Sequence, residues 1–340
     1  MSRQALRVIT NSEQRAFRRC AREHLYAYEQ RYRPVVEADT LRFGTLIHRA
    51  LEAYWRRDIT APRLARALTA LEAASDPFEA ALARALLIGY DARWQDDDFE
   101  VIGVEVEFTA PLINPATDRA SKTFMLGGKL DVLVRRAIGV FIMEHKTSSE
   151  DLGAGSNYWA RLRIDSQIST YYTGARALGH EIVGAIYDVL ARPQLRPLKA
   201  TPIEDRKYTK KDNRLYANQR ETDETPDEYE LRVLKHIGEN VDRYYHRGDV
   251  VCLEAEEREA QFDTWQVARL IREAELAQRY PRNADACVRY GRLCDFFSVC
   301  TGAASLDDPT RFRRTETAHE ELSHASTSTA DAANDNATNP

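Results

Sequence analysis

An aspartate and a Glu-x-Lys triplet stand close together in an otherwise apolar part of the sequence. Asp131 follows Gly-Lys-Leu, and Glu144 and Lys146 follow the hydrophobic run Val-Phe-Ile-Met. Carboxylate oxygens are ligands that Mg²⁺ and Mn²⁺ prefer, and such an ion polarises a phosphate and lowers the pKa of water. A lysine beside them would position the attacking water. The alternative is an ordinary cross-strand ion pair on a solvated sheet face.

This chemistry requires strands that bring the three side chains together. Residues 124–135 and 140–146 are predicted strands joined by a short connection, and residues 101–108 alternate as a third strand before them. Side chains two positions apart in a strand share a face, so the glutamate and the lysine point the same way. Hairpin pairing then brings the aspartate alongside, and the three strands predict an antiparallel meander.

Helical periodicity accounts for most of the remaining chain. The strongest amphipathic pattern covers Phe43 to Trp55, with apolar residues at i, i+3, i+4 and i+7. Further helices are predicted at about 12–32, 78–94, 164–179, 227–247 and 256–279, with a strand at 184–190. We expect one domain over residues 1–305, divided into a helical part at 10–95, a sheet core at 100–190, a charged excursion at 192–226, and C-terminal helices with a cysteine segment at 227–300. Residues 306–340, rich in Ser, Thr, Ala, Asp and Asn, are expected to be disordered.

Four of the five cysteines form a pattern typical of a metal or cluster site. Cys287, Cys294 and Cys300 are spaced C-x6-C-x5-C, and Cys20 lies far away near the start. No apolar run is long enough to span a bilayer and the start lacks a secretory signal, so we expect a cytoplasmic protein with reduced thiols. Buried free thiols and a four-thiolate zinc site are the alternatives, although zinc ligands usually come in closely spaced pairs. Cys252 is interpreted as a small core residue.

The overall charge does not exclude a nucleic-acid partner. The formal net charge is −5, but residues 301–340 hold seven acidic residues against three arginines and so carry −4 of it. The body is therefore close to neutral and can still present a basic surface. Residues 206–220 are the one dense basic and aromatic stretch, a composition that can track phosphates and stack bases, or can simply be solvated.

Gly128-Lys-Leu-Asp131 followed by Glu144-His-Lys146 resembles the PD-(D/E)XK nuclease superfamily. The resemblance is closer to its RecB/AddB-like branch, which includes CRISPR-adaptation and phage recombination exonucleases. It implies an α/β fold with a restriction-endonuclease-like core, in which helices flank a mixed central sheet. It also implies a metal-dependent nuclease in which Asp131, Glu144 and Lys146 are catalytic.

The same resemblance assigns roles to residues outside these motifs. It implies that His48, in Phe-Gly-Thr-Leu-Ile-His, joins Asp131 and Glu144 as a ligand of Mg²⁺ or Mn²⁺, together with the His145 carbonyl. Gln167-Ile-Ser-Thr-Tyr171 matches the Gln-x-x-x-Tyr motif, whose i, i+4 spacing places both side chains on one helix face to support substrate. An acidic residue of the preceding strand also matches, and it is either Glu105 or its same-face neighbour Glu107.

For the cysteines, the resemblance implies a [4Fe–4S] cluster held by Cys20, Cys287, Cys294 and Cys300. Such a cluster would staple the N-terminal helix to the C-terminal segment and close a very long loop. Many members of the branch have a C-x2-C pair within the triplet, and this chain does not.

The expected activity is hydrolysis of DNA, more as an exonuclease than as a sequence-specific enzyme, because no recognition module is evident. The chain lacks G-x-x-x-x-G-K-[ST], so a helicase, or else a single-strand annealing protein, would act in trans. Phage recombination, repair and CRISPR adaptation all remain open as pathways. The rival hypothesis is a non-catalytic DNA-binding subunit, stabilised by the cluster, in a recombination or repair complex.

Overall fold

The computed structural model describes residues 6–322 except 37, 58–59, 98, 163, 251–253 and 290, and Cys252 therefore lies outside the described residues. Within them, the core is a six-stranded sheet in the order β1-β4-β5-β6-β7, in which β3 also pairs with β4. Its strands are β1 (Arg7–Thr10), β3 (Glu100–Asn114), β4 (Arg119–Arg136), β5 (Gly139–Ser148), β6 (Ile182–Ala191) and β7 (Tyr245–Val250).

The sheet combines antiparallel and parallel pairing. β3, β4 and β5 form the expected antiparallel meander, and β6 then joins β5 in parallel. That parallel connection passes through α6 (Asn157–Leu162) and α7 (Ser166–Ala177), which pack on one face of the sheet. The short β1 pairs in parallel with the first half of β4, and β7 runs antiparallel along β6.

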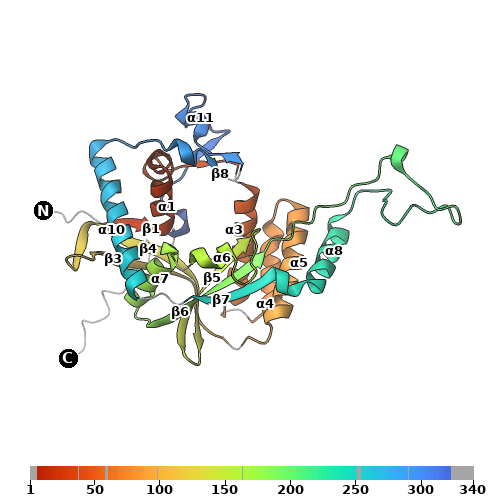
Figure 1. Ribbon diagram of the computed structural model, residues 1–340, viewed down its shortest axis with the longest axis horizontal. Coiled ribbons are helices and arrows are strands. Elements are labelled where there is room, and N and C mark those ends of the chain that lie inside the picture. The colour runs from red at the N-terminus through yellow and green to blue at the C-terminus, as the bar shows by residue number, and fades with distance from the viewer. Residues whose placement is uncertain are drawn as a thin grey trace, which may run out of the picture.

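The two faces of the sheet are covered by different helices (Figure 1). The larger core cluster packs on the face opposite α7 and is supplied by α3 (Asp39–Trp55), α4 (Arg63–Ala70), α5 (Pro77–Trp94) and α8 (Pro226–Glu239). A separate cluster joins β1, β3 and β4 to α10 (Glu254–Ala277). An α/β fold with a mixed central sheet flanked by helices is therefore confirmed.

Local sequence explains why the principal helices form where they do. In α3 the apolar residues Phe43, Ile47, Leu51, Tyr54 and Trp55 are each at most 2% exposed, so its amphipathic face is the buried one. In α5 the side chain before the first turn accepts hydrogen bonds from two backbone N–H groups of that turn, and a proline occupies the first turn.

Two predicted helices have the wrong boundaries. The helix expected at 12–32 breaks into α1 (Asn11–Arg19), α2 (Ala21–His24) and the π-helical turn η1 (Leu25–Glu29). The helix expected at about 164–179 is confirmed as α7. The helix expected at 227–247 ends at Glu239, and its last residues lie in the short α9 (Val241–Tyr244) and in β7.

The C-terminal segment is more ordered than its composition predicts. Residues 306–322 were expected to be disordered, but β10 (Phe312–Arg314) pairs with β2 (Tyr32–Pro34). The buried Phe312 ring stacks on Phe296, with ring centroids 5.4 Å apart. One aromatic anchor and a main-chain ladder thus order this segment despite its polar composition.

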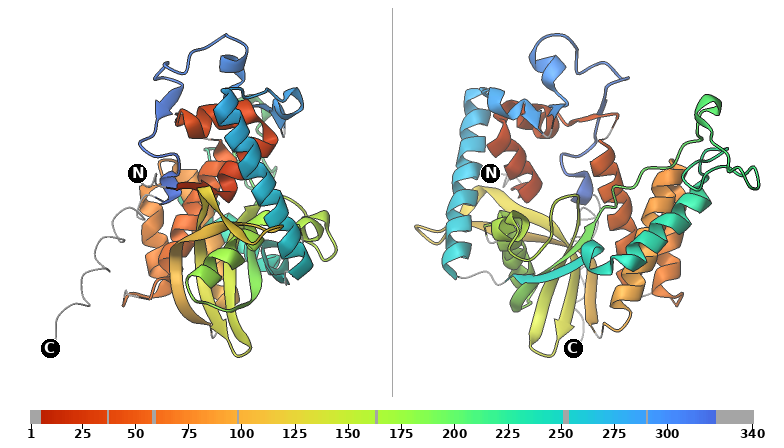
Figure 2. Two further views of the ribbon diagram at one scale, coloured as in Figure 1. Left: turned by 90° about the vertical axis from the view of Figure 1, so that its left-hand side faces the viewer. Right: turned by 45° about the vertical axis from the view of Figure 1, so that its right-hand side comes forward.

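The remaining described elements are short, and they are η2 (Leu71–Ala73), η3 (Ile203–Asp205), η4 (Ala284–Ala286), β8 (Val288–Arg289), β9 (Arg292–Leu293), α11 (Phe297–Cys300) and η5 (Glu320–Leu322). Residues 192–225, between β6 and α8, contain little regular structure and project from the body (Figures 1 and 2). Among the described helices, none has the length and apolar character needed to cross a membrane.

Candidate active site

The β4–β5 hairpin brings the two acidic residues together. Val132 pairs with Met143, so the next position along each strand places Asp131 opposite Glu144. The Asp131 carboxylate accepts a 2.8 Å hydrogen bond from the backbone N–H of His145. Both carboxylates are removed from solvent, since Asp131 is 9% and Glu144 1% exposed.

Lys146 and the helix residue Gln167 complete a hydrogen-bonded group around Glu144. The Lys146 ammonium lies 2.5 Å from Glu144 Oε1 and 2.9 Å from Gln167 Oε1. The Gln167 amide donates to Glu144 Oε1 and to the Tyr171 hydroxyl, both at 2.7 Å. Gln167 therefore touches the glutamate, the lysine and the tyrosine at once.

The N-terminus of α7 fixes this glutamine. Asp165 caps the helix by accepting a 2.9 Å hydrogen bond from the Gln167 backbone N–H, and it also accepts one from the Tyr187 hydroxyl at 3.3 Å. Tyr187 is the register partner of Glu144 on β6. Sequence reasoning missed Asp165 and Tyr187, although an aspartate directly before a helix is a recognisable cap signal.

His48 approaches the carboxylates from α3. Its Nδ1 lies 3.6 Å from Asp131 Oδ2, and its side chain remains partly exposed. Burial lowers the pKa of His48 to about 4. The imidazole is therefore neutral at pH 7 and has a lone pair free to bind a metal ion.

Of the two glutamates considered on β3, Glu105 is the one beside the site. Val104 of β3 pairs with Val132 of β4, and Val106 pairs with Leu130, so Glu105 lies beside Asp131 on the neighbouring strand. Glu105 has a left-handed backbone, with φ of 52°, and its carboxylate pairs with Lys129. Burial raises its pKa. Glu107 lies two positions further along the strand.

The side chain of His145 is held by a buried polar network that sequence reasoning did not find. Its Nδ1 lies 2.9 Å from Oδ2 of Asp188, which is 1% exposed. The same Asp188 carboxylate accepts from the Tyr90 hydroxyl at 2.5 Å and from Arg247 Nε at 2.7 Å. The other ring nitrogen of His145, Nε2, is buried and has no hydrogen-bond partner in the described structure.

Electrostatics at Glu144 favour a bound cation. Burial, reinforced by the Asp131 charge, raises the pKa of Glu144 to about 7. Glu144 Oε2 is buried and, within the described structure, has no hydrogen-bond partner. Two desolvated carboxylates and an orphaned oxygen are costly unless a cation joins them. The oxygen-rich donor set fits Mg²⁺ or Mn²⁺, so a divalent ion suits these residues.

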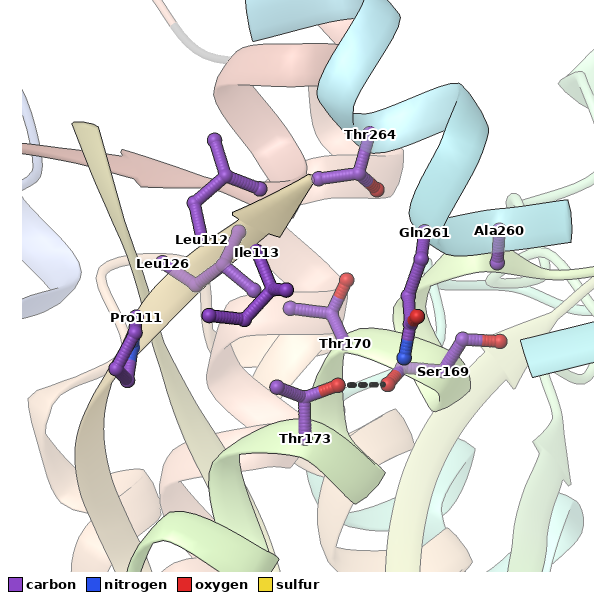
Figure 3. A pocket seen from close by; sticks show the side chains of 10 residues that line it. All are labelled: Pro111, Leu112, Ile113, Leu126, Ser169, Thr170, Thr173, Ala260, Gln261 and Thr264. Atoms are coloured by element: carbon purple, nitrogen blue, oxygen red, sulfur yellow. Dashed lines mark hydrogen bonds between the residues drawn. The ribbon is translucent and has the colours of Figure 1, made fainter. Parts of the chain in front are cut away.

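Two other features of the described structure, a cluster of possible metal ligands and a pocket, are separate from this candidate active site. Glu13, His24 and Glu29 have ligand atoms within 4.8 Å of one another, but the Arg7 guanidinium pairs with both glutamates and supplies the cation. Figure 3 shows a second pocket between β3, α7 and α10, lined by residues such as Leu112, Thr173 and Gln261. None of the catalytic candidates lines that pocket.

The four cysteines expected to act together line a single pocket. Cys20, Cys287, Cys294 and Cys300 are free thiols that surround it, together with the Phe296 and Phe297 side chains. Among the described residues, the sulfur atoms of these four cysteines do not all lie within 4.8 Å of one another.

Comparison with known proteins gives one decisive match. The model of the PD-(D/E)XK nuclease superfamily covers residues 9–301. No curated protein matches. A solved structure described as the crystal structure of SSO0001 is similar, with 14% identity over 67% of this chain and 84% of that chain, but its TM-score of 0.22 carries no argument. The match over most of the chain shows that the protein belongs to the PD-(D/E)XK nuclease superfamily.

Proposed function

We propose that the protein is a metal-dependent DNA nuclease, acting as an exonuclease. The observation that carries this proposal is that Asp131 and Lys146 lie beside Glu144, whose Oε2 is buried and has no hydrogen-bond partner among the described residues. Asp131 and Glu144 would hold Mg²⁺ or Mn²⁺ with His48 and the His145 carbonyl. The ligand atoms of the three side chains do not all lie within 4.8 Å of one another, so sharing one ion draws at least one of them inward. The ion supplies polarisation of the phosphate and a lowered pKa for water.

The chain's own residues then orient the reacting groups. Lys146, anchored by Glu144 and Gln167, presents its ammonium to the attacking water and balances the negative charge. Although burial lowers the pKa of Lys146, the charges of Glu144 and Asp131 raise it by more, so the lysine is a protonated ammonium at neutral pH. Gln167 and Tyr171 support the arrangement from α7, and Glu105 borders it.

The substrate and partners follow from the same proposal. We infer DNA as the substrate, with a helicase or a single-strand annealing protein supplied in trans, and a cytoplasmic location. Digestion of end-labelled single- and double-stranded DNA with Mg²⁺ and Mn²⁺ tests it directly. Lys146→Ala is expected to lower the rate by at least about 10²-fold, as loss of a proton-handling group does, while the surface variant Lys235→Ala keeps full activity. Equal cleavage by wild type and Lys146→Ala removes the proposal, and DNA binding without cleavage favours the non-catalytic alternative.

We also propose that Cys20, Cys287, Cys294 and Cys300 hold a [4Fe–4S] cluster. Their gathering around one pocket from opposite ends of the chain supports this, because four thiolates are the ligand set of such a cluster. A single zinc ion held by the same four thiolates, at Zn–S distances of about 2.3 Å, is the alternative that metal analysis distinguishes. Burial raises the pKa of Cys294 to about 11, so bound iron would have to stabilise its thiolate.

Anaerobic purification provides the test of the cluster. The protein is expected to be brown and to contain about four irons per chain. Cys294→Ser should lose the colour, whereas Cys252→Ser, which changes the leftover cysteine, should keep it. Colourless wild-type protein that contains zinc would contradict this part of the proposal.

A further inference from the structure

A projecting arm, residues 192–225, leaves the sheet at the catalytic end. Lys146 on β5 is the register partner of Val189 on β6, and β6 ends only two residues later. The first residue of the arm, Arg192, donates its backbone N–H to the Ser148 carbonyl at 2.7 Å. Its guanidinium lies 4.4 Å from the ring centroid of Phe43, on the helix that carries the candidate ligand His48. A strand of substrate that passes the end of β5 therefore meets the root of the arm.

The arm is ordered by polar contacts and not by an apolar core. At its root, the buried Glu224 carboxylate accepts from the Leu198 backbone N–H at 2.8 Å and pairs with Arg232 of α8. Further out, Arg206 donates to the Thr201 carbonyl at 3.0 Å. Apolar side chains stay in solvent, and Ile203 is 79% exposed. Figures 1 and 2 show the arm extending away from the other layers of the fold.

The tip of the arm, residues 206–220, is a closed loop. The Thr209 backbone N–H donates to the Arg214 carbonyl at 2.8 Å, and the Arg214 N–H donates back to the Thr209 hydroxyl at 3.1 Å. Asn213 takes the left-handed conformation that asparagine tolerates well, with φ of 49°. These bonds hold Lys210 and Lys211 at the apex.

The tip concentrates positive charge in an acidic protein. It contains six lysines and arginines and a single acid, while the whole chain has a formal net charge of −5. In the part of the chain that the structure describes, no carboxylate lies within 4.0 Å of the ammonium groups of Lys207, Lys210 and Lys211. Tyr208 and Tyr216 are 42% and 45% exposed. Tyr208 bridges Leu215, so the two tyrosines lie on opposite faces of the hairpin.

We propose that this arm binds the DNA backbone outside the active site and so holds the substrate during cleavage. The inference rests on the proposed function for the identity of the substrate. Unpaired lysines suit phosphates and exposed tyrosine rings suit bases, and the tip presents both together. Twelve residues separate Leu198 from Lys210, so the apex reaches at most ~40 Å from the root, or roughly twelve base pairs along a duplex.

The test is a salt titration of DNA binding in EDTA, where no cleavage occurs. Fluorescence anisotropy with a duplex of roughly 40 base pairs, longer than the reach of the arm, compares the wild type with Lys210→Gln/Lys211→Gln. The matched control is Lys122→Gln/Lys235→Gln, which removes the same charge from exposed positions on β4 and α8. Losing two phosphate contacts makes the slope of log K against log salt shallower by about 1.8 in the arm variant, while the control keeps the wild-type slope. Over a fourfold rise in salt, the wild type then loses about tenfold more affinity than the arm variant.

The outcomes separate the arm from the nuclease assignment. If no DNA is cleaved with Mg²⁺ or Mn²⁺ but the arm variant still shows the shallower slope, the nuclease assignment fails and the arm stands. If DNA is cleaved but the arm variant and the control have the same slope and affinity, the arm proposal is overturned and an acidic protein becomes the better partner. Cleavage of a duplex of roughly eight base pairs, shorter than the reach of the arm, should be equal in wild type and arm variant.

Discussion

Asp188 is a residue whose substitution should damage the scaffold of the site without removing a proposed metal ligand. Its buried carboxylate accepts from Tyr90, His145 and Arg247 at 2.5, 2.9 and 2.7 Å. Asp188→Asn keeps the shape of the side chain but removes the charge and turns an N–H₂ group toward these donors. Arg247, whose side chain is 8% exposed, would then keep only its pair with Asp97.

The structure sets the size of the effect. Removing one partner of a buried ion pair costs about 3–5 kcal/mol, because the other charge stays buried. The pKa of Asp188 gives an independent estimate of this free energy. Burial alone would raise that pKa, but Arg247 and His145 lower it from 3.8 to about 2. A shift of this size corresponds to roughly 2 kcal/mol that is present above pH 3.8 and lost as the pH falls through about 2. We therefore expect Asp188→Asn to lower the free energy of unfolding by about 3 kcal/mol at pH 7.

Urea denaturation followed by circular dichroism measures this change. The matched control is Asp249→Asn on the neighbouring strand β7, whose carboxylate pairs with Arg136 at an exposed position and should contribute at most about 1 kcal/mol. Because Asp188 orients His145, whose backbone N–H binds Asp131, the nuclease rate should fall as well. Equal free energies of unfolding for the two variants would refute the argument that this network supports the site.

Three further predictions concern single residues. Gln167→Ala should lower kcat by about 10²-fold with a smaller change in KM, because the glutamine positions Lys146 and Glu144. Steady-state kinetics on end-labelled DNA measure both constants. Because burial and Asp131 raise the pKa of Glu144 to about 7, Mn²⁺ binding must displace a proton at acidic pH, and calorimetry should find affinity about fivefold weaker at pH 6 than at pH 7. Burial lowers the pKa of His319, but its hydrogen bond to Glu13 helps to raise it to about 9, so its stabilisation is complete below pH 6.5 and is lost as the pH rises through 9. The Tm difference between wild type and His319→Gln should therefore shrink between pH 6 and pH 10, and a constant difference would contradict this assignment.

Sequence reasoning predicted the parts of the fold that depend on local periodicity. The amphipathic pattern of α3 and the alternation in β3, β4 and β5 each follow from one buried face, which the residue order records directly. β7 was missed because its short polar sequence directly follows the helical pattern of α8 and α9 and was included in that predicted helix. Its strand conformation depends on pairing with β6, which the local sequence does not show. β1 has only four residues, and its pairing with β4 is a tertiary choice that local sequence does not specify.

At the site, the spacing of the sequence indicated the two carboxylates and the lysine, which two adjacent strands carry, whereas the helix glutamine was assigned only through the family resemblance. The support behind them comes from distant positions. Asp188, Tyr90 and Arg247 belong to β6, α5 and β7, and nothing in their local sequence indicates that they meet under His145. Likewise, only the three-dimensional arrangement distinguishes Glu105 from Glu107, since both lie on one predicted strand face.

The most direct measurement of the central claim is equilibrium binding of Mn²⁺, followed by electron paramagnetic resonance. The wild type should bind an ion that is lost in Glu144→Gln and in Asp131→Asn, while Glu107→Gln, on the adjacent strand, retains it. Circular dichroism should show all variants folded, because removing one of two repelling buried carboxylates does not unfold the protein. If Glu144→Gln binds Mn²⁺ as tightly as the wild type, the two carboxylates do not share an ion and the proposed active site is wrong.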